Sequence, residues 1–265
     1  MKASIIISYY KAISNLKLIL DALSNQSAND FEVIISEDDA NTDTITSIEE
    51  FRSIYHFNIK HTNQKTDNGF RKNEMLNKSI LAAEAPLIIF IDGDCIPHPE
   101  FVKNYIGAFN DQLILAGRKV NLGPKFSKKL METQDIDILQ WQKLILTDTQ
   151  QVKEGIYSPQ APINFSEVKS VVGCNWGVAK EALLDVNGFD ENYTAPGIGE
   201  DTDIEWRLKQ NGLTIKSMKN KAIVFHIYHK RTYTNEMVKK NRDILNQTKA
   251  SHQVVCLNGI EKLPL

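Results

Sequence analysis

The sequence predicts an α/β fold built on a mainly parallel, doubly wound sheet. Three observations support this prediction. Apolar runs of strand length recur along the chain, segments with the apolar spacing of a helix lie between them, and the two alternate regularly as far as residue 91. Because a helix that connects two parallel strands crosses over with a right hand, this alternation places helices on both faces of one sheet.

The first strand and helix show the pattern clearly. Residues 4–9 form an isoleucine-rich run without a helical period, as in a strand buried on both faces, and Leu16, Leu20 and Leu23 follow at helical spacing. Pro86 ends the third helix before the fourth strand. The other elements expected in this half are strands at residues 31–36, 58–61 and 87–91 and helices at residues 45–54 and 71–83.

The second half of the chain is less regular. From about residue 123 to residue 170 we expect an insertion or a lid, with a helical stretch through Trp141 and a loop at residues 155–165. Regular signals return at Val171 and Val172, and they predict a helix at 180–185, a glycine-containing loop at 196–199, a helix at 201–211 and a strand at 222–225. We interpret residues 1–265 as one domain with parts at 1–120, 121–170 and 171–232 and a helical tail at 233–265.

The composition is that of an ordinary globular domain, with 42% hydrophobic and 24% charged residues. The formal net charge of −2 argues against a nucleic-acid partner, which normally requires a basic excess. Three widely spaced cysteines predict neither a disulfide framework nor a structural zinc site. No signal-peptide pattern and no apolar run of about 18 residues is present. The sequence therefore predicts a cytoplasmic protein whose membrane contact, at the inner face, is peripheral.

An Asp-Gly-Asp motif, Asp92 to Asp94, directly follows the expected strand at residues 87–91. At the carboxyl end of a parallel strand the chain enters the crevice in which α/β folds bind ligands. Two carboxylates separated by a glycine can converge there on one hard cation, such as Mg²⁺ or Mn²⁺, which would neutralise a diphosphate. Asp-Gly is also common in solvated turns, but the apolar strand before it favours the metal site.

Acidic residues also follow the second expected strand. Asp38 and Asp39 could accept hydrogen bonds from a base N–H or from ribose hydroxyls. Asn41, Thr42 or Asp43 could instead cap the next helix, which requires no ligand. We expect both, with capping by the later residues and nucleotide contact by Asp38 or Asp39.

Arg71 lies at the start of the third expected helix, shortly after Gly69. Its planar guanidinium could bind a diphosphate together with the free N–H groups of the helix start. A surface arginine is more often only solvated, so this segment alone leaves both interpretations open.

A fourth motif, residues 197–203, combines two glycines with several acids. Gly199 would let the loop approach a ligand closely, and Glu200 and Asp201 could hold an acceptor hydroxyl and remove its proton. Acids in the first turn of a helix also favour the helix dipole, but that role hardly requires four carboxylates so close together.

Two histidines, His226 and His229, follow the last expected strand. In an extended chain, residues three apart point to opposite faces, so both could contact one metal ion only if the chain turns between them. We therefore expect one ligand rather than two, and this depends on the Asp-Gly-Asp turn lying nearby.

These segments, in this order, resemble the GT-A glycosyltransferases of family 2. The resemblance covers roughly residues 3–120 and 170–232, and the second half is similar to the carboxyl-terminal domain of β-1,4-galactosyltransferases and chondroitin-polymerase-type enzymes. Residues 37–43 resemble the family's Asp-Asp-Gly-Ser-Thr-Asp, with Ala40 in place of the usual glycine. The other matching segments are residues 4–10, 69–71, 90–97, 175–177, 187–190 and 199–203.

The resemblance implies the GT-A (nucleotide-diphospho-sugar transferase) fold, with residues 1–120 as the nucleotide-sugar-binding half and a mixed acceptor and catalytic half at 171–232. It implies Asp38 as the base-contacting residue, Asp201 as the catalytic base, and His229 rather than His226 as the metal ligand. The candidate residues are Ser8, Tyr9, Asp38, Asp39, Arg71 and Asp92 for the nucleotide sugar; Asp92, Asp94, His226 and His229 for Mn²⁺ or Mg²⁺; Asn175, Trp176, Gly199 and Glu200 for the acceptor; and Asp201 and Glu200 for catalysis.

The resulting hypothesis is an inverting, metal-dependent transfer of a sugar from UDP-hexose or UDP-N-acetylhexosamine to a carbohydrate acceptor, in surface polysaccharide or glycan synthesis. Asp94, and Asp92 directly or through water, would hold the metal, and Asp201 would deprotonate the acceptor hydroxyl. One alternative is a nucleotidyltransferase, which would more naturally carry a glycine-rich phosphate loop where residues 8–11 contain no glycine. The other is a non-catalytic sugar- or nucleotide-binding module.

Overall fold

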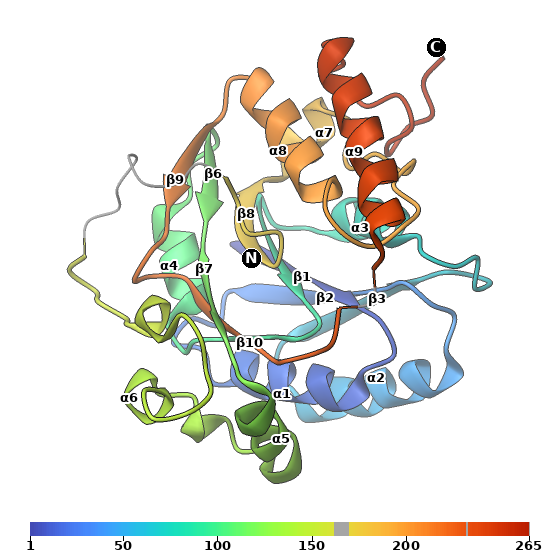
Figure 1. Ribbon diagram of the computed structural model, residues 1–265. Coiled ribbons are helices and arrows are strands. Elements are labelled where there is room, and N and C mark those ends of the chain that lie inside the picture. The colour runs from blue at the N-terminus through green and yellow to red at the C-terminus, as the bar shows by residue number, and fades with distance from the viewer. Residues whose placement is uncertain (162–169, 232, 265) are drawn as a thin grey trace.

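A seven-stranded sheet forms the centre of the protein (Figure 1). The structure is a computed structural model that describes residues 1–161, 170–231 and 233–264. The strand order is β3-β2-β1-β4-β8-β6-β9. The strands of this sheet are β1 Ala3–Tyr9, β2 Phe31–Glu37, β3 Asn58–Asn63, β4 Leu87–Asp92, β6 Leu113–Ala116, β8 Asn175–Ala179 and β9 Thr214–Ser217. The predicted α/β class with a mainly parallel sheet is confirmed.

Helices cover both faces of this sheet, as the alternation of strands and helices predicts. In β1, Ile5 and Ile7 pack into the core on the side of α1 and α2, whereas Ile6 packs on the side of α3. This alternation explains why β1 reads as a continuous apolar run. The helices on the first side are α1 Ile13–Ser24, α2 Thr42–Ile54 and α4 Phe101–Ala108, and those on the second side are α3 Lys72–Ala82, α7 Lys180–Asp185 and α8 Glu200–Gln210.

The sheet becomes mixed in its second half. Strand β8 is antiparallel to both of its neighbours, β4 and β6, while β9 runs parallel to β6. The expected mixed part is therefore present. The regular pattern predicted from Val171 and Val172 begins later in the structure, because β8 starts at Asn175. Val172 makes only an isolated bridge with Asn175.

A second sheet of three short strands crosses the carboxyl edge of the first. Its order is β5-β10-β7, with β5 Cys95–Pro97, β10 Ile223–His226 and β7 Arg118–Asn121. Strand β10 is antiparallel to β5 and parallel to β7. Because β5 follows the Asp-Gly-Asp motif directly, this small sheet brings residues of the second half to the metal-site candidates.

The stretch after β7 packs beside the small sheet in four short helical pieces, α5 Pro124–Thr133, η1 Ile136–Ile138, α6 Trp141–Leu144 and η2 Val152–Gly155. The expected helical stretch through Trp141 is thus broken, since Gln134 adopts a left-handed conformation with φ 52° that ends α5. Of the expected loop at residues 155–165, residues 162–165 lie outside the described part of the chain. The division into 1–120, 121–170, 171–232 and 233–265 stays a prediction.

Helix α9, Asn235–Ala250, packs on α8 near the end of the chain. The buried Asn241 on α9 donates a hydrogen bond from Nδ2 to the carbonyl oxygen of Ala195. This contact fixes α9 to the loop ahead of α8. Among the helices of the described residues, none combines the length and the apolar character required to cross a bilayer.

Candidate active site

The Asp-Gly-Asp turn is fixed against the end of β1. The backbone N–H of Gly93 donates to the carbonyl oxygen of Ser8 at 2.7 Å, and a Cβ on Gly93 would lie 2.9 Å from that oxygen. Only glycine allows this close approach without a shift of the backbone. Asp92 and Asp94 therefore leave the sheet at the carboxyl ends of β1 and β4, as the sequence predicts.

Asp94 lies between two histidines. Its Oδ2 is 3.1 Å from Nε2 of His229 and 3.5 Å from Nε2 of His226, and the two rings are 5.2 Å apart. His226 ends β10 and the chain turns before His229, so the structure brings both histidines to Asp94 where the sequence favoured one. Cys95 adds a buried thiol, which donates to Oδ1 of Asp94 at 3.3 Å.

The charges of this cluster depend on one another. Burial opposes ionisation of Asp94, but the hydrogen bond from His229 and the charges of both histidines outweigh it and lower the pKa of Asp94. The same hydrogen bond raises the pKa of His229 to about 9, whereas burial lowers the pKa of His226. Asp94 is thus ionised and faces imidazole nitrogen, and ligand atoms of Asp94, Cys95 and His226 lie within 4.8 Å of one another. Carboxylate oxygen with imidazole nitrogen is a donor set that fits a divalent cation such as Mn²⁺.

The opposite wall of the site is the start of α8. Gly199 precedes the helix with φ 142°, a conformation that favours glycine, and places Glu200 and Asp201 in the first turn. Glu200 is buried, and its Oε2 has no hydrogen-bond partner among the described residues. Burial, together with the charge of Asp201, raises the pKa of Glu200 against the opposing charge of Lys72.

Lys72 joins the two walls, a role that the sequence alone does not indicate. Its Nζ lies 3.3 Å from Oδ1 of Asp92 and 3.6 Å from Oε1 of Glu200. Lys72 follows Arg71 in the same segment, so the basic pair was visible, but only the start of α3 reveals which of the two side chains enters the site. The pKa of Lys72 is raised, because the charges of Asp92 and Glu200 outweigh the effect of its burial.

Asp201 is partly exposed and lines the cleft. Its Oδ1 accepts a hydrogen bond from the backbone N–H of Thr202 at 2.8 Å. Its Oδ2 fits against Gly173, where an added Cβ would lie only 2.4 Å from that oxygen. Gly173 therefore leaves the space in which the Asp201 carboxylate sits.

The acids after β2 have partners within the protein. Asp38 accepts hydrogen bonds from the backbone N–H of Arg71 and from Nε2 of Gln64, both at 2.8 Å to Oδ1. Burial nevertheless raises the pKa of Asp38 to about 6. Oδ2 of Asp39 lies 3.3 Å from Nζ of Lys11. The expected capping of α2 is present, with the Asn41 side chain accepting from the N–H of Asp43.

Arg71 does not line the cleft; its Nη1 donates to the carbonyl oxygen of Phe70. Of the two residues proposed at the end of β1, Ser8 lines the cleft, but Tyr9 is 1% exposed and its hydroxyl lies 3.5 Å from that of Thr44. The next residue, Tyr10, is 57% exposed and lines the cleft instead. Tyr10 directly follows the last residue of β1, and alternation along extended chain explains the difference, because successive side chains point to opposite faces.

The predicted acceptor residues Asn175 and Trp176 belong to the core in this structure. Asn175 is fully buried, accepts from the hydroxyl of Tyr105, and donates to the carbonyl oxygens of Arg118 and Ala222. The ring of Trp176 stacks on Phe90 with centroids 4.6 Å apart. Both side chains hold strands together, and neither lines the main cleft.

The two walls enclose one cleft of about 550 Å³ at the carboxyl edge of the sheet. Both predicted metal-site acids, both histidines and the Glu200–Asp201 pair line it. The site can therefore hold a cation and an anionic group on one wall and offer a carboxylate as proton acceptor on the other.

Comparison with known families identifies the class. The profile of Glycosyl transferase family 2 matches residues 4–184, more than half of the chain, and a profile described as the N-terminal domain of galactosyltransferase matches residues 162–230. The chain belongs to glycosyl transferase family 2.

Two curated relatives cover most of this chain. Chondroitin synthase of Escherichia coli is 27% identical over 249 residues, which are 84% of this chain and 34% of the relative. Hyaluronan synthase of Pasteurella multocida is 26% identical over 240 residues, which are 81% of this chain and 23% of the relative. The chain thus spans about a third or less of the length of these relatives.

Solved structures show the same fold. TarS of S. aureus has a TM-score of 0.63 and 17% identity, covering 96% of this chain and 41% of its own. The mannosyltransferase PcManGT of Pyrobaculum calidifontis, in complex with GDP-Man and Mn²⁺, has a TM-score of 0.63 and 14% identity, covering 95% of this chain and 64% of its own. GalNAc-T7, solved with UDP, GalNAc and Mn²⁺, has a TM-score of 0.64 and 13% identity, covering 93% of this chain and 48% of its own. The predicted GT-A fold is therefore confirmed.

Proposed function

We propose that this chain transfers a sugar from a nucleotide sugar to a carbohydrate acceptor with the help of a divalent cation and with inversion at the anomeric carbon. The observation that carries the proposal is the arrangement of the cleft. The Asp94 cluster occupies one wall, and the Glu200–Asp201 pair, bridged to Asp92 by Lys72, occupies the other. Donor and acceptor can then meet between a cation-binding wall and a proton-accepting wall.

Asp94, His226 and His229 would hold the cation, with Asp92 directly or through water. When bound, it would neutralise charge on the diphosphate leaving group. The donor set supports Mn²⁺, because imidazole nitrogen suits a transition metal better than it suits Mg²⁺. The solved structures of GalNAc-T7 and PcManGT contain Mn²⁺, which further supports this ion.

Asp201 would remove the proton of the attacking hydroxyl. The carboxylate is partly exposed in the cleft, as a base must be to reach a substrate, while Gly173 and the N–H of Thr202 fix its position. Glu200 is more deeply buried and contacts Lys72, so it would hold an acceptor hydroxyl instead. Displacement by this hydroxyl requires no covalent intermediate, which agrees with inversion.

The nucleotide would lie at the ends of β1 and β2. Ser8 and Tyr10 line the cleft there. Asp38, which is buried and not among the residues that line the cleft, would accept a hydrogen bond from a base N–H. UDP is the proposed carrier, since TarS and GalNAc-T7 have been solved with UDP. The names of the two curated relatives support an acceptor that is a growing polysaccharide.

A donor screen tests the proposal. The purified chain is incubated with Mn²⁺ and with UDP-, GDP- or dTDP-sugars, with and without saccharide acceptors, and released nucleoside diphosphate is measured. Chelator-treated samples and an Asp94→Ala variant serve as controls. Metal-dependent release that increases with an acceptor supports the proposal, whereas binding of nucleotide sugar without any release would indicate a non-catalytic binding module. Release of pyrophosphate would indicate a nucleotidyltransferase.

A further inference from the structure

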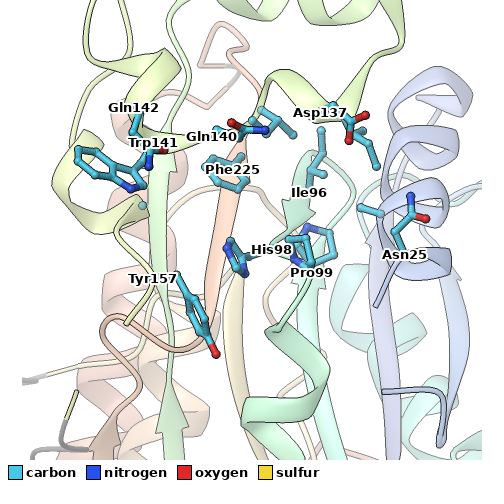
Figure 2. Close-up of a pocket in the computed structure, with 15 residues that line it drawn as sticks. Asn25, Ile96, His98, Pro99, Asp137, Gln140, Trp141, Gln142, Tyr157 and Phe225 are labelled. Atoms are coloured by element: carbon cyan, nitrogen blue, oxygen red, sulfur yellow. The ribbon is translucent and has the colours of Figure 1, made fainter. Parts of the chain in front are cut away.

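A second cavity of about 620 Å³ lies behind the small sheet. Figure 2 shows that Phe225 and Ile96 lie between aromatic side chains on one side and polar side chains on the other. None of the residues that line this cavity lines the main cleft. The two spaces are therefore separate.

The cavity and the cleft use opposite faces of the same short strands. In β10, Phe225 faces the cavity and His226 faces the cleft. In β5, Ile96 lines the cavity, while Cys95 contacts Asp94. Because successive residues of a strand point to opposite faces, β5 and β10 separate the cavity from the metal-site candidates.

The segment that follows β7 supplies the outer wall of the cavity. Asp137 in η1, Gln140, Trp141 in α6 and Tyr157 all line it. None of the described residues 121–161 lines the main cleft. The described part of this stretch, which the sequence predicts to be an insertion or a lid, therefore forms the wall of this cavity.

The aromatic lining presents flat apolar surface. Trp141 and Tyr157 are both partly exposed. The ring centroids of Tyr157 and His98 are 4.8 Å apart, and the angle between the two ring planes is 30°. Burial lowers the pKa of His98, so its imidazole is neutral at neutral pH. Nδ1 of His98 accepts from the N–H of Glu100, so Nε2 carries the proton and can donate.

The polar lining has free hydrogen-bonding capacity. Asn25, Asp137 and Gln140 are exposed, Trp141 and Tyr157 are partly exposed, and none of their side-chain polar atoms makes a hydrogen bond to another described residue. Amide and carboxylate groups of this kind can each bind hydroxyls. Within the described chain, the lining includes the acid Asp137 and no lysine or arginine, which disfavours phosphate, sulfate and other anions.

These features suit one chemical class of ligand. A pyranose ring has apolar C–H faces that can pack on aromatic rings and equatorial hydroxyls that can bind amides and carboxylates. A volume of about 620 Å³ also lies within the usual range for small-ligand sites. We propose that this cavity is a second carbohydrate site, which binds neutral sugar units of an oligosaccharide outside the active-site cleft. The inference draws on the proposed function only for the idea that carbohydrate chains reach this protein.

A glycan array of neutral and acidic oligosaccharides tests the site, with the labelled chain and excess UDP and Mn²⁺ to occupy the cleft. We expect binding to neutral oligosaccharides that is unchanged in Asp94→Ala. The Trp141→Ala variant should bind about tenfold more weakly, the loss expected when one stacked ring is removed. Trp141→Phe keeps an aromatic face and should retain most of the affinity, which separates stacking from a disturbed fold.

Matched substitutions sharpen the test. Asp137→Asn keeps a side chain that can bind hydroxyls, so this variant should still bind neutral sugars. Leu146 lies on the same segment but outside the cavity and is 96% exposed, so Leu146→Ala should bind as the unchanged chain does. Titration calorimetry with the best oligosaccharide gives the affinities. Binding to acidic glycans alone, loss of all binding in Asp94→Ala, or no neutral glycan whose binding depends on Trp141 would overturn the inference. Each of these results leaves nucleoside diphosphate release, and hence the proposed function, unaffected.

Discussion

The ammonium group of Lys72 approaches Glu200 across the cleft, with Nζ 3.6 Å from Oε1. Because the charge of Lys72 opposes the upward shift of the Glu200 pKa, its removal should raise that pKa further. We expect Lys72→Met to lower turnover and to move the acidic limb of the kcat/KM profile to higher pH, since a raised pKa delays ionisation. Lys72→Arg keeps the positive charge and should return the acidic limb part of the way to its original pH.

The control for this substitution is Lys78→Met on the same helix, because Lys78 pairs at the surface with Glu74 and with no other described residue. Its pH profile should match that of the unchanged chain. A Lys72→Met profile with an unmoved acidic limb would mean that Lys72 does not act on Glu200.

Asp94→Ala should abolish metal-dependent transfer while the fold survives, since Asp94 is partly exposed and its loss leaves no cavity in the core. His229→Ala should weaken Mn²⁺ binding more than His226→Ala, because His229 lies closer to Asp94. Titration calorimetry with Mn²⁺ measures both. The reverse order would assign the stronger ligand to His226.

Asp201→Asn should retain the shape of the first turn of α8 but lose the proton acceptor. We expect nearly unchanged binding of UDP-sugar and metal and a loss of roughly 10² to 10⁴ in turnover, the usual contribution of general-base catalysis. Glu200→Gln should act mainly on acceptor affinity. Near-normal turnover in Asp201→Asn together with a large loss in Glu200→Gln would make Glu200 the base.

Gly173→Ala should displace the Asp201 carboxylate, because the new methyl group would lie 2.4 Å from its Oδ2. Turnover should fall while donor affinity changes little. Gly107→Ala is the matched control, since a Cβ there contacts nothing within 4 Å and Gly107 lies inside α4. That control should be active and slightly more stable to heat, by up to about 1 kcal/mol. Equal activity of the two variants would show that Asp201 tolerates displacement.

Asp38 should make UDP binding depend on pH. Its pKa of about 6 means that the carboxylate ionises as pH rises through 6, so UDP affinity should rise over the same range. In the folded chain this pKa lies above that of free aspartate, about 3.9, so folding stability should fall as pH rises from about 4 to 6 and stay level above it. Asp38→Asn should bind UDP more weakly, show a smaller rise of UDP affinity around pH 6, and lose the fall in folding stability between about pH 4 and 6.

Calorimetry with UDP between pH 5 and 8, together with thermal unfolding, measures these effects. The same substitution at Asp43, an exposed residue in the first turn of α2, should leave UDP affinity unchanged. An Asp38→Asn variant with the affinity of the unchanged chain would remove Asp38 from the nucleotide site.

The sequence predicted the elements whose signals are local. Strands β1, β2 and β4 are largely apolar runs, and the expected helix at residues 180–185 matches α7. The small sheet was missed apart from β10, because β5 and β7 have only three and four residues and are held by pairing with a strand about a hundred residues away. Such long-range pairing leaves no periodic signal.

The residues of the site were also predicted from local motifs, which do not reveal the directions of the side chains. The acids of the Asp-Gly-Asp turn, both histidines and the Glu200–Asp201 pair meet in one cleft. Sequence proximity could not determine that Tyr10 rather than Tyr9 faces it, that Lys72 rather than Arg71 enters it, or that Trp176 stacks in the core. Each of these depends on the direction of a side chain, which is set by the tertiary structure: by the end of β1 for Tyr10, by the start of α3 for Lys72, and by the pairing of β8 with β4 for Trp176.

The position of β8 between β4 and β6 also sets an order of events during synthesis on the ribosome. Strands β3, β2, β1 and β4 can pair as soon as residue 92 has emerged, but the partner on the other edge of β4 ends at residue 179. Until then the nascent chain exposes an unpaired apolar edge that contains Ile88 and Phe90. Slow translation between these two points would prolong the period in which newly made chains can associate with one another.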